Sequence, residues 1–170
     1  GDAATGTYAM ANALPGDQFP LVQSIKEQVY GAGKGNLAED SRIGTVYWNR
    51  GLGAAVTYIE ALRVAQEMHD KVGKAVTGAE FRAGYESLVM DDARLEELGI
   101  KGMIAPFAMS CAENAGAGKF AMMQWDGTLF QQVTDWEEPL DPAYIRGLVE
   151  ASAAKFASDN CITPRECPAS

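Results

Sequence analysis

The 170-residue chain carries 23 acidic and 14 basic side chains, which gives a formal net charge of −9. Nucleic-acid phosphates would repel such a surface, and no run of Lys and Arg forms a local basic patch, so we expect no nucleic-acid partner. A hydrophobic content of 47% fits one ordinary domain with a core of its own, and no apolar segment approaches the ~20 residues that span a bilayer, so the chain is not predicted to be membrane-embedded.

The first predicted elements are a short strand and a helix. In residues 7–11, larger side chains alternate with alanine, which indicates a strand. Residues 12–17 contain Pro15 and Gly16 and break the chain. A helix is then predicted over 20–30, because Pro20 suits a first turn and apolar side chains recur at helical spacing at Leu21, Val22, Ile25 and Val29.

The longest predicted helix runs from about Trp48 to Val72. Its expected buried stripe consists of Leu52, Ala55, Val56, Ile59 and Leu62. The side chains expected to face water are Arg50, Thr57, Glu60, Arg63, Glu67 and Asp70.

Two shorter helices are predicted from their capping residues. Thr77 and Glu80 form a capping-box pattern, with Phe81, Tyr85 and Leu88 following on one face. Asp91 is expected to cap a further short helix that carries Leu95 and Leu98 and ends at Gly99.

The last third is predicted to contain strands and one more helix. Residues 107–111 are expected to be extended, and the arms 120–125 and 128–133 flank Asp126-Gly127, a pair typical of a type I′ hairpin turn. A helix is predicted from Asp141-Pro142 through Asn160, with four apolar side chains facing inward: Ile145, Leu148, Val149 and Phe156. The predicted strands are few for so many helices, and the hairpin and the first strand have edges without a pairing strand. The chain is therefore expected to be part of a larger α/β protein.

Enzymatic and metal chemistry find little support in the sequence. The glycine-rich stretches 31–35 and 116–119 lack the strand, helix and hydroxyl context of a phosphate-binding loop. His69, the single histidine, is expected on the outer part of a helix, which leaves a hydrolase without a base and a metal site short of ligands. We therefore expect no enzyme activity, no metal and no cofactor.

The three cysteines are Cys111, Cys161 and Cys167. None of their spacings matches a zinc knuckle. A cysteine in a proline-containing tail gains little as a small buried group, so one disulfide and one free thiol are favoured over three reduced thiols. An oxidising compartment follows from a disulfide.

The stretch 46–53 is the best candidate for ligand binding. It places Tyr47, Trp48, Asn49 and Arg50 at the start of the longest helix. The guanidinium fork of an arginine matches a carboxylate, so this cluster could bind one. The other interpretation is that Tyr47 and Trp48 pack while Arg50 is solvated, and the residues alone favour this one.

Several stretches together, in this order and spacing, resemble one family. They are Thr45–Gly51 leading into Glu60–Gln66, then Ser110–Asn114, Gln124–Gly127 and the tail Ile162–Cys167, preceded by the opening Gly1–Gly6. The chain resembles the C-terminal part of a type I periplasmic solute-binding protein of an ABC transporter, of the leucine/isoleucine/valine-binding class. Two departures are Asn114, where relatives often carry His, and Cys161, where many carry Gly.

The resemblance implies a fold of two α/β lobes joined by three crossing strands, here helix-rich with a β-hairpin. Residues 1–12 would be a second-lobe strand and crossing, and 13–106 the helical portion of the first lobe. Residues 107–170 would supply the last crossing, the second-lobe hairpin and the C-terminal helix. The front half of the family pattern is absent, so the missing N-terminal part of the same protein is an expected partner.

The resemblance also implies a function. The protein would bind a small carboxylate-bearing solute, such as a branched-chain amino acid, in the periplasm by lobe closure and deliver it to an ABC permease. Tyr47 would line the cleft by resemblance, with Trp48, Asn49 and Arg50 as adjacent candidates.

The resemblance favours a Cys111–Cys167 disulfide, while proximity in sequence permits Cys161–Cys167. The alternatives for function are a ligand-sensing regulatory domain of the same fold and a small hydrolase.

Overall fold

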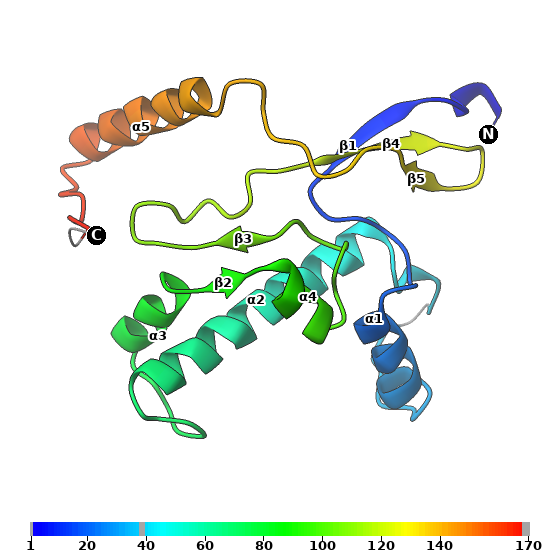
Figure 1. Cartoon of the computed structure of the whole chain (residues 1–170), viewed down its shortest axis with the longest axis horizontal. Helices are drawn as coiled ribbons and strands as arrows, with labels where there is room; N and C mark the ends of the chain where they lie inside the picture. The colour runs from blue at the N-terminus through cyan, green and yellow to red at the C-terminus, as the bar shows by residue number, and fades with distance from the viewer. Residues whose placement is uncertain (1, 38–39, 168–170) are drawn as a thin grey trace. The chain divides into compact units, whose positions relative to one another are not determined.

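The computed structural model describes residues 2–37 and 40–167 (Figure 1). The chain divides into two compact units, Gly1–Glu137 and Glu138–Ser170.

A three-stranded antiparallel sheet joins the beginning and end of the first unit. Its strands are β1 (Tyr8–Ala11), β4 (Ala121–Trp125) and β5 (Phe130–Gln132), in the order β1-β4-β5. β1 pairs with β4 in the register Tyr8 opposite Gln124. Both the strand near the N-terminus and the hairpin predicted from the sequence are therefore confirmed.

The hairpin turn differs from the predicted type I′ turn. The last cross-strand pair is Trp125 with Phe130, which leaves a four-residue loop. Gly127 has a positive φ of +106° but Asp126 does not. Instead, the Asp126 carboxylate accepts hydrogen bonds from the backbone N–H groups of Thr128 and Leu129. This side-chain capping stabilises a longer loop than Asp-Gly alone predicts.

The first helix begins where the sequence predicts it. α1 (Pro20–Ile25) starts with proline in its first turn and continues through a π-helical turn, Lys26–Tyr30. Val22 is fully buried, and Phe19, at the N-cap, is nearly so. Apolar burial on one face explains the helix.

The longest helix, α2 (Val46–Met68), begins two residues earlier and ends four residues earlier than predicted. Asp70 adopts a left-handed φ of 52° just after the C-cap. The Lys71 N–H then donates to the Gln66 carbonyl, and the Asp70 N–H to Glu67. These two bonds form a Schellman motif, which closes the helix before Val72.

The predicted buried stripe of α2 is largely wrong. Val56 is buried and Leu52 half-buried, but Ala55, Ile59 and Leu62 are exposed. The buried residues are instead mostly small or polar: Asn49, Gly53, Val56, Glu60, Ala61 and Ala65.

The small residues allow α3 (Gly78–Tyr85) to approach α2 closely. A Cβ added at Gly84 would lie 2.6 Å from the Ala61 carbonyl oxygen and from atoms of Ala65. The prediction followed the larger apolar side chains. Close packing of the two backbones instead buries the face of α2 that carries the smallest side chains.

Both predicted caps in the middle of the chain are confirmed. The Thr77 hydroxyl accepts from the Glu80 N–H, and the Glu80 carboxylate accepts from the Thr77 N–H. Asp91 accepts from the Arg94 N–H at the start of α4 (Asp92–Glu97), and Gly99, with a φ of +69°, follows its end.

The most deeply buried part of the core surrounds α4. β2 (Val89–Met90) and β3 (Phe107–Ala108) pair antiparallel beside it, so only the first two residues of the predicted extended piece 107–111 form a strand. The fully buried large apolar side chains are Leu88, Met90, Leu95, Ile100, Met103 and Val22. Five of these six lie between positions 88 and 103.

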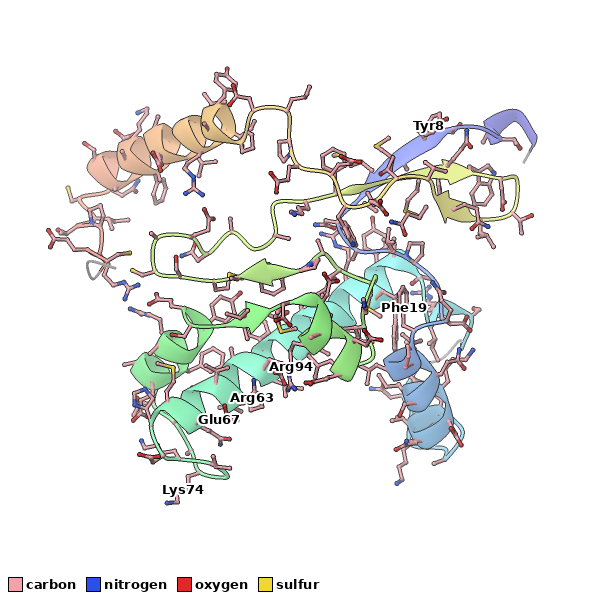
Figure 2. All side chains as sticks on the ribbon, viewed as in Figure 1. Tyr8, Phe19, Arg63, Glu67, Lys74 and Arg94 are labelled. Carbon is pink, nitrogen blue, oxygen red and sulfur yellow. The ribbon has the colours of Figure 1, made fainter. Side chains whose placement is uncertain are left out.

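An ionic cluster connects α4 to α2, where Figure 2 shows Arg63 and Arg94 near one another. Arg94 donates to both Glu60 carboxylate oxygens at 2.7 and 2.8 Å, and Arg63 Nε donates to Glu60 at 3.0 Å. Glu60 is only 3% exposed, so its predicted contact with water is wrong. Burial opposes ionisation, but the hydrogen bonds from Arg94 and Arg63 outweigh it and lower the pKa of Glu60.

The second unit contains α5 (Pro142–Asp159), whose bounds agree with the prediction. Asp141 accepts a hydrogen bond from the Tyr144 N–H and so caps the helix. The predicted inward face is wrong: none of the residues 142–159, all of which the structure describes, is buried. The apolar side chains predicted to be buried are 48–62% exposed, at Ile145, Leu148, Val149 and Phe156.

Candidate functional site

A cavity of about 850 Å³ lies within the first unit. Four segments line it: residues 9–11 of β1, the loop 14–18, residues 41 and 43–46 before and at the start of α2, and the hairpin residues 123 and 129–132. The cavity therefore collects segments from both ends of the first unit.

The sheet provides an apolar wall. Ala9 and Met123 are directly paired across β1 and β4, and Phe130 belongs to the same sheet. Phe130 also packs against Trp125, with ring centroids 5.2 Å apart. This wall suits an apolar ligand group.

Asp17, the one carboxylate that the described residues place on the cavity wall, has a cationic partner. Lys26 donates a hydrogen bond to it, and this bond with the charge of Lys26 lowers the pKa of Asp17. Gln23 additionally donates to the Asp17 backbone carbonyl. Asp17 is therefore ionised and paired near neutral pH, which weakens its use as an isolated anionic contact.

The start of α2 brings positive potential to the cavity. Thr45 occupies the N-cap, but its hydroxyl donates to the Arg42 carbonyl at 2.9 Å and makes no capping bond to the helix. The first turn of α2 contains no acidic residue. The helix N-terminus, whose residues Thr45 and Val46 line the cavity, can thus accept an anionic group such as a carboxylate.

The four residues predicted from the sequence lie just beyond this helix start. Tyr47 is 78% exposed, Arg50 is exposed, and Trp48 is half-buried against the core. Asn49 is fully buried, and its Nδ2 donates to the carbonyls of Leu14 and Gly16, each at 2.9 Å. None of the four is among the residues that line the cavity.

The sequence pointed to residues near the start of α2, but not to the loop 14–18 or the hairpin face that line the cavity. The breaker Pro15-Gly16 after the predicted strand was the one available signal for the loop. Nothing in the sequence spacing placed that loop opposite residues more than a hundred positions away.

Cys111 and Cys167 are disulfide-bonded, whereas Cys161 is an exposed free thiol. Within residues 2–37 and 40–167, no group of three or more His, Cys, Asp and Glu side chains is placed to hold a metal ion. Over the same residues, no helix combines the length and apolar composition that a bilayer crossing requires.

Two solved structures resemble the chain. One, an ABC transporter permease from the Pseudomonas fluorescens group, superimposes with a TM-score of 0.88 and 34% identity, over 99% of this chain and 40% of its own. The other, a branched-chain amino acid ABC transporter from Thermus thermophilus with bound valine, gives a TM-score of 0.62 and 21% identity, over 87% of this chain and 36% of its own. No protein-family model and no curated protein matches the chain.

These likenesses confirm the predicted fold class. The chain has the α/β fold of a type I periplasmic binding protein, helix-rich and with a β-hairpin. It spans well under half the length of either similar structure. Both similar proteins are described as ABC transporter components.

Proposed function

We propose that this chain is part of the solute-binding protein of an ABC transporter, and that it binds a small carboxylate-bearing molecule without transforming it. The observation that carries the proposal is the likeness over 99% of the chain, at 34% identity, to a structure described as an ABC transporter component. The cavity adds a place where a small ligand fits.

The chemistry of the cavity supports an amino acid with an apolar side chain. The sheet wall of Ala9, Met123 and Phe130 offers contacts for an aliphatic group. The uncapped start of α2 at Thr45 offers backbone N–H groups and a positive helix dipole for a carboxylate. Valine, which occupies the Thermus thermophilus structure, has both features.

The candidate residues keep distinct roles within this proposal. Val46, whose backbone N–H lies in the first turn of α2, would meet the carboxylate from the cavity wall. Tyr47 and Arg50 are exposed beside that wall and could contact a ligand from the other side of a closing cleft. Trp48 packs against the core, which favours a supporting role.

The proposed mechanism is closure of two lobes around the ligand. Residues 13–106 would belong to the first lobe, and residues 1–12 and 107–170 to the second. A ligand shifts such an equilibrium only through contacts made in the closed form. The closed protein would then be presented to an ABC permease in the periplasm, a compartment in which the disulfide of Cys111 and Cys167 would persist.

A thermal-shift screen of the full-length protein tests the proposal. L-valine, L-leucine and aromatic acids are the probes, and L-valinamide, which lacks the carboxylate, is the matched control. Binding should raise Tm, and raise it further as the ligand concentration increases above Kd, whereas the amide should fail to do so. If no carboxylate raises Tm, or valinamide acts as well as valine, the proposal is wrong.

Two variants then separate the candidate contacts. Arg50→Ala should abolish or reduce the valine-induced shift if the guanidinium meets the ligand in the closed form. An unchanged shift would return Arg50 to the solvated surface. Tyr47→Ala tests the exposed aromatic in the same way.

A further inference from the structure

Asn49 is a fully buried amide in the second turn of α2, and it reaches back to the loop that precedes α1. Its Nδ2 donates to the Leu14 carbonyl and to the Gly16 carbonyl, each at 2.9 Å. A carboxamide nitrogen carries two protons. Both of them are therefore used, and neither is free to meet a ligand.

The loop 14–16 is held by three separate segments of the first unit. Besides the bonds from Asn49, the Leu14 N–H donates to Met103 at 2.8 Å and the Gly16 N–H donates to Gly44 at 2.7 Å. Pro15 has no N–H to donate. Every backbone N–H of the loop, and two of its three carbonyls, is thus paired with residues distant in sequence.

The same loop forms part of the cavity wall. Leu14, Pro15 and Gly16 line it, and Gly44, which accepts from Gly16, lines it too. The fit at this point is tight, because a Cβ added at Gly44 would lie 2.9 Å from the Gly16 carbonyl carbon. Movement of the loop therefore changes the shape of the cavity directly.

The carboxamide oxygen of Asn49, Oδ1, is buried without a hydrogen-bond partner among the described residues. A buried acceptor without a donor destabilises a fold, so the bonds from Nδ2 are what this side chain contributes.

We infer that Asn49 is a positioning residue: it fixes loop 14–16 against the start of α2, and so sets the shape of the ligand cavity without touching the ligand. The effect of Asn49 on ligand binding rests on the proposed function, whereas its effect on the loop does not. It gives a distinct role to one of the residues that sequence reasoning grouped as ligand contacts.

Hydrogen exchange on the full-length protein tests the loop without any ligand. Asn49→Ala removes both donors, and Leu95→Ala, a core change that lines no part of the cavity, is the control of comparable instability. Loss of one hydrogen bond should increase the equilibrium constant for opening of the loop roughly tenfold. We expect the Gly16 amide to exchange about tenfold or more faster in Asn49→Ala than in Leu95→Ala, and equal rates would overturn the inference.

Binding of L-valine gives the second readout. The Kd should rise about tenfold or more in Asn49→Ala and stay unchanged in Leu95→Ala, both measured well below their Tm values. A purely structural role would lower Tm in both variants and leave the two Kd values equal. If valine binds neither the wild type nor any variant, the proposed function fails while hydrogen exchange still decides the role of Asn49.

The wild-type protein provides a measurement that survives poor folding of the variants. Two protons donated inside a closed core should be protected from solvent, so the Asn49 carboxamide protons should exchange as slowly as the Gly16 amide. Exchange at the rate of an exposed asparagine would overturn the inference.

Discussion

The helices α4 and α5 begin and end in the same way, yet only α4 contains a buried residue. Asp91 and Asp141 each cap the N-terminus by accepting a backbone N–H three residues later. Each helix closes with the same pair of bonds, a Schellman motif, centred on Gly99 in α4 and on Cys161 in α5. Leu95 of α4 is fully buried, whereas α5 buries nothing among its 18 residues.

The difference separates two kinds of information in the sequence. Capping bonds join residues within one turn, so they form wherever the local sequence permits them. Burial of an apolar stripe also needs a second surface to cover it. α4 has that surface in Leu88, Met90 and Met103 of its own unit, whereas the described residues 138–167 of the second unit provide none for α5.

The largest predicted effect distinguishes the two apolar stripes. Leu95→Ala should destabilise the chain by about 3 kcal/mol, because it opens a cavity in a closed core. Leu148→Ala, the matched change on α5, should cost below about 0.5 kcal/mol. Urea unfolding measures both. An equal cost for the two would show that the α5 stripe is covered, and the comparison of the two helices would fail.

The second prediction concerns what holds α4 in place. Glu60→Gln should cost about 2 kcal/mol, because it removes the charge that Arg94 and Arg63 share in a nearly closed site. Glu97→Gln, which touches the same Arg94 from an exposed position, should cost below about 0.5 kcal/mol. Denaturation of both variants at neutral pH is the measurement, and similar losses would show that α4 does not depend on the buried carboxylate.

The third prediction uses the one difference between the two Schellman motifs. Cys161 adopts a φ of 53°, which favours glycine, so Cys161→Gly should stabilise the second unit by about 0.5–1 kcal/mol. Thermal melting of the helix, followed by circular dichroism, is the measurement, and a lower melting temperature would contradict the expected strain.

The reverse change at α4 sharpens the same point. Gly99→Ala should cost about 1 kcal/mol or more, because its φ is +69° and an added Cβ would lie 2.9 Å from the Leu21 nitrogen. A neutral result there would show that the motif tolerates a side chain in both helices.

The smallest predicted effect concerns the cap of α3. A hydrogen bond from Lys71, with others from Thr77, lowers the pKa of Glu80 to about 2 from an ordinary 4.5. Because the folded pKa is the lower one, the stabilisation is fully present above about pH 4.5 and is lost as the pH falls toward 2. Glu80→Gln should flatten the loss of stability in that window, with a small change because the pair is only half-buried and lies within reach of solvent. Unfolding curves between pH 6 and pH 2.5 measure it, and an unaltered slope would contradict the assignment.

Local chemistry explains how much of the fold was predictable. The starts of three helices could be predicted from Thr77, Asp91 and Asp141, because a capping motif spans only four residues. The prediction that Glu60 faces water failed because its partner Arg94 lies 34 positions away, and a charged side chain gives no local sign that it will be paired and buried.

The candidate site shows the same limit. The sequence pointed to Tyr47–Arg50 near the start of α2, but the cavity is lined by Thr45 and Val46 there, and by loop 14–18 and Phe130 of the hairpin. Close backbone packing on α2 was equally hidden, because Ala61, Ala65 and Gly84 have no hydrophobic periodicity strong enough to compete with Ile59 and Leu62. Contacts between distant segments decide both features.

The pairing of β1 with β4 has a consequence for the order in which the molecule forms. Gln124 donates to the Gly6 carbonyl across 118 positions, whereas α2 and α3 are neighbours along the chain. Closing so long a loop costs conformational entropy before the two strands make any contact. Non-local pairings slow folding for this reason. The sheet wall of the cavity should therefore form late, after the helices, so that a nascent or stressed chain acquires its helical core well before it acquires the cavity.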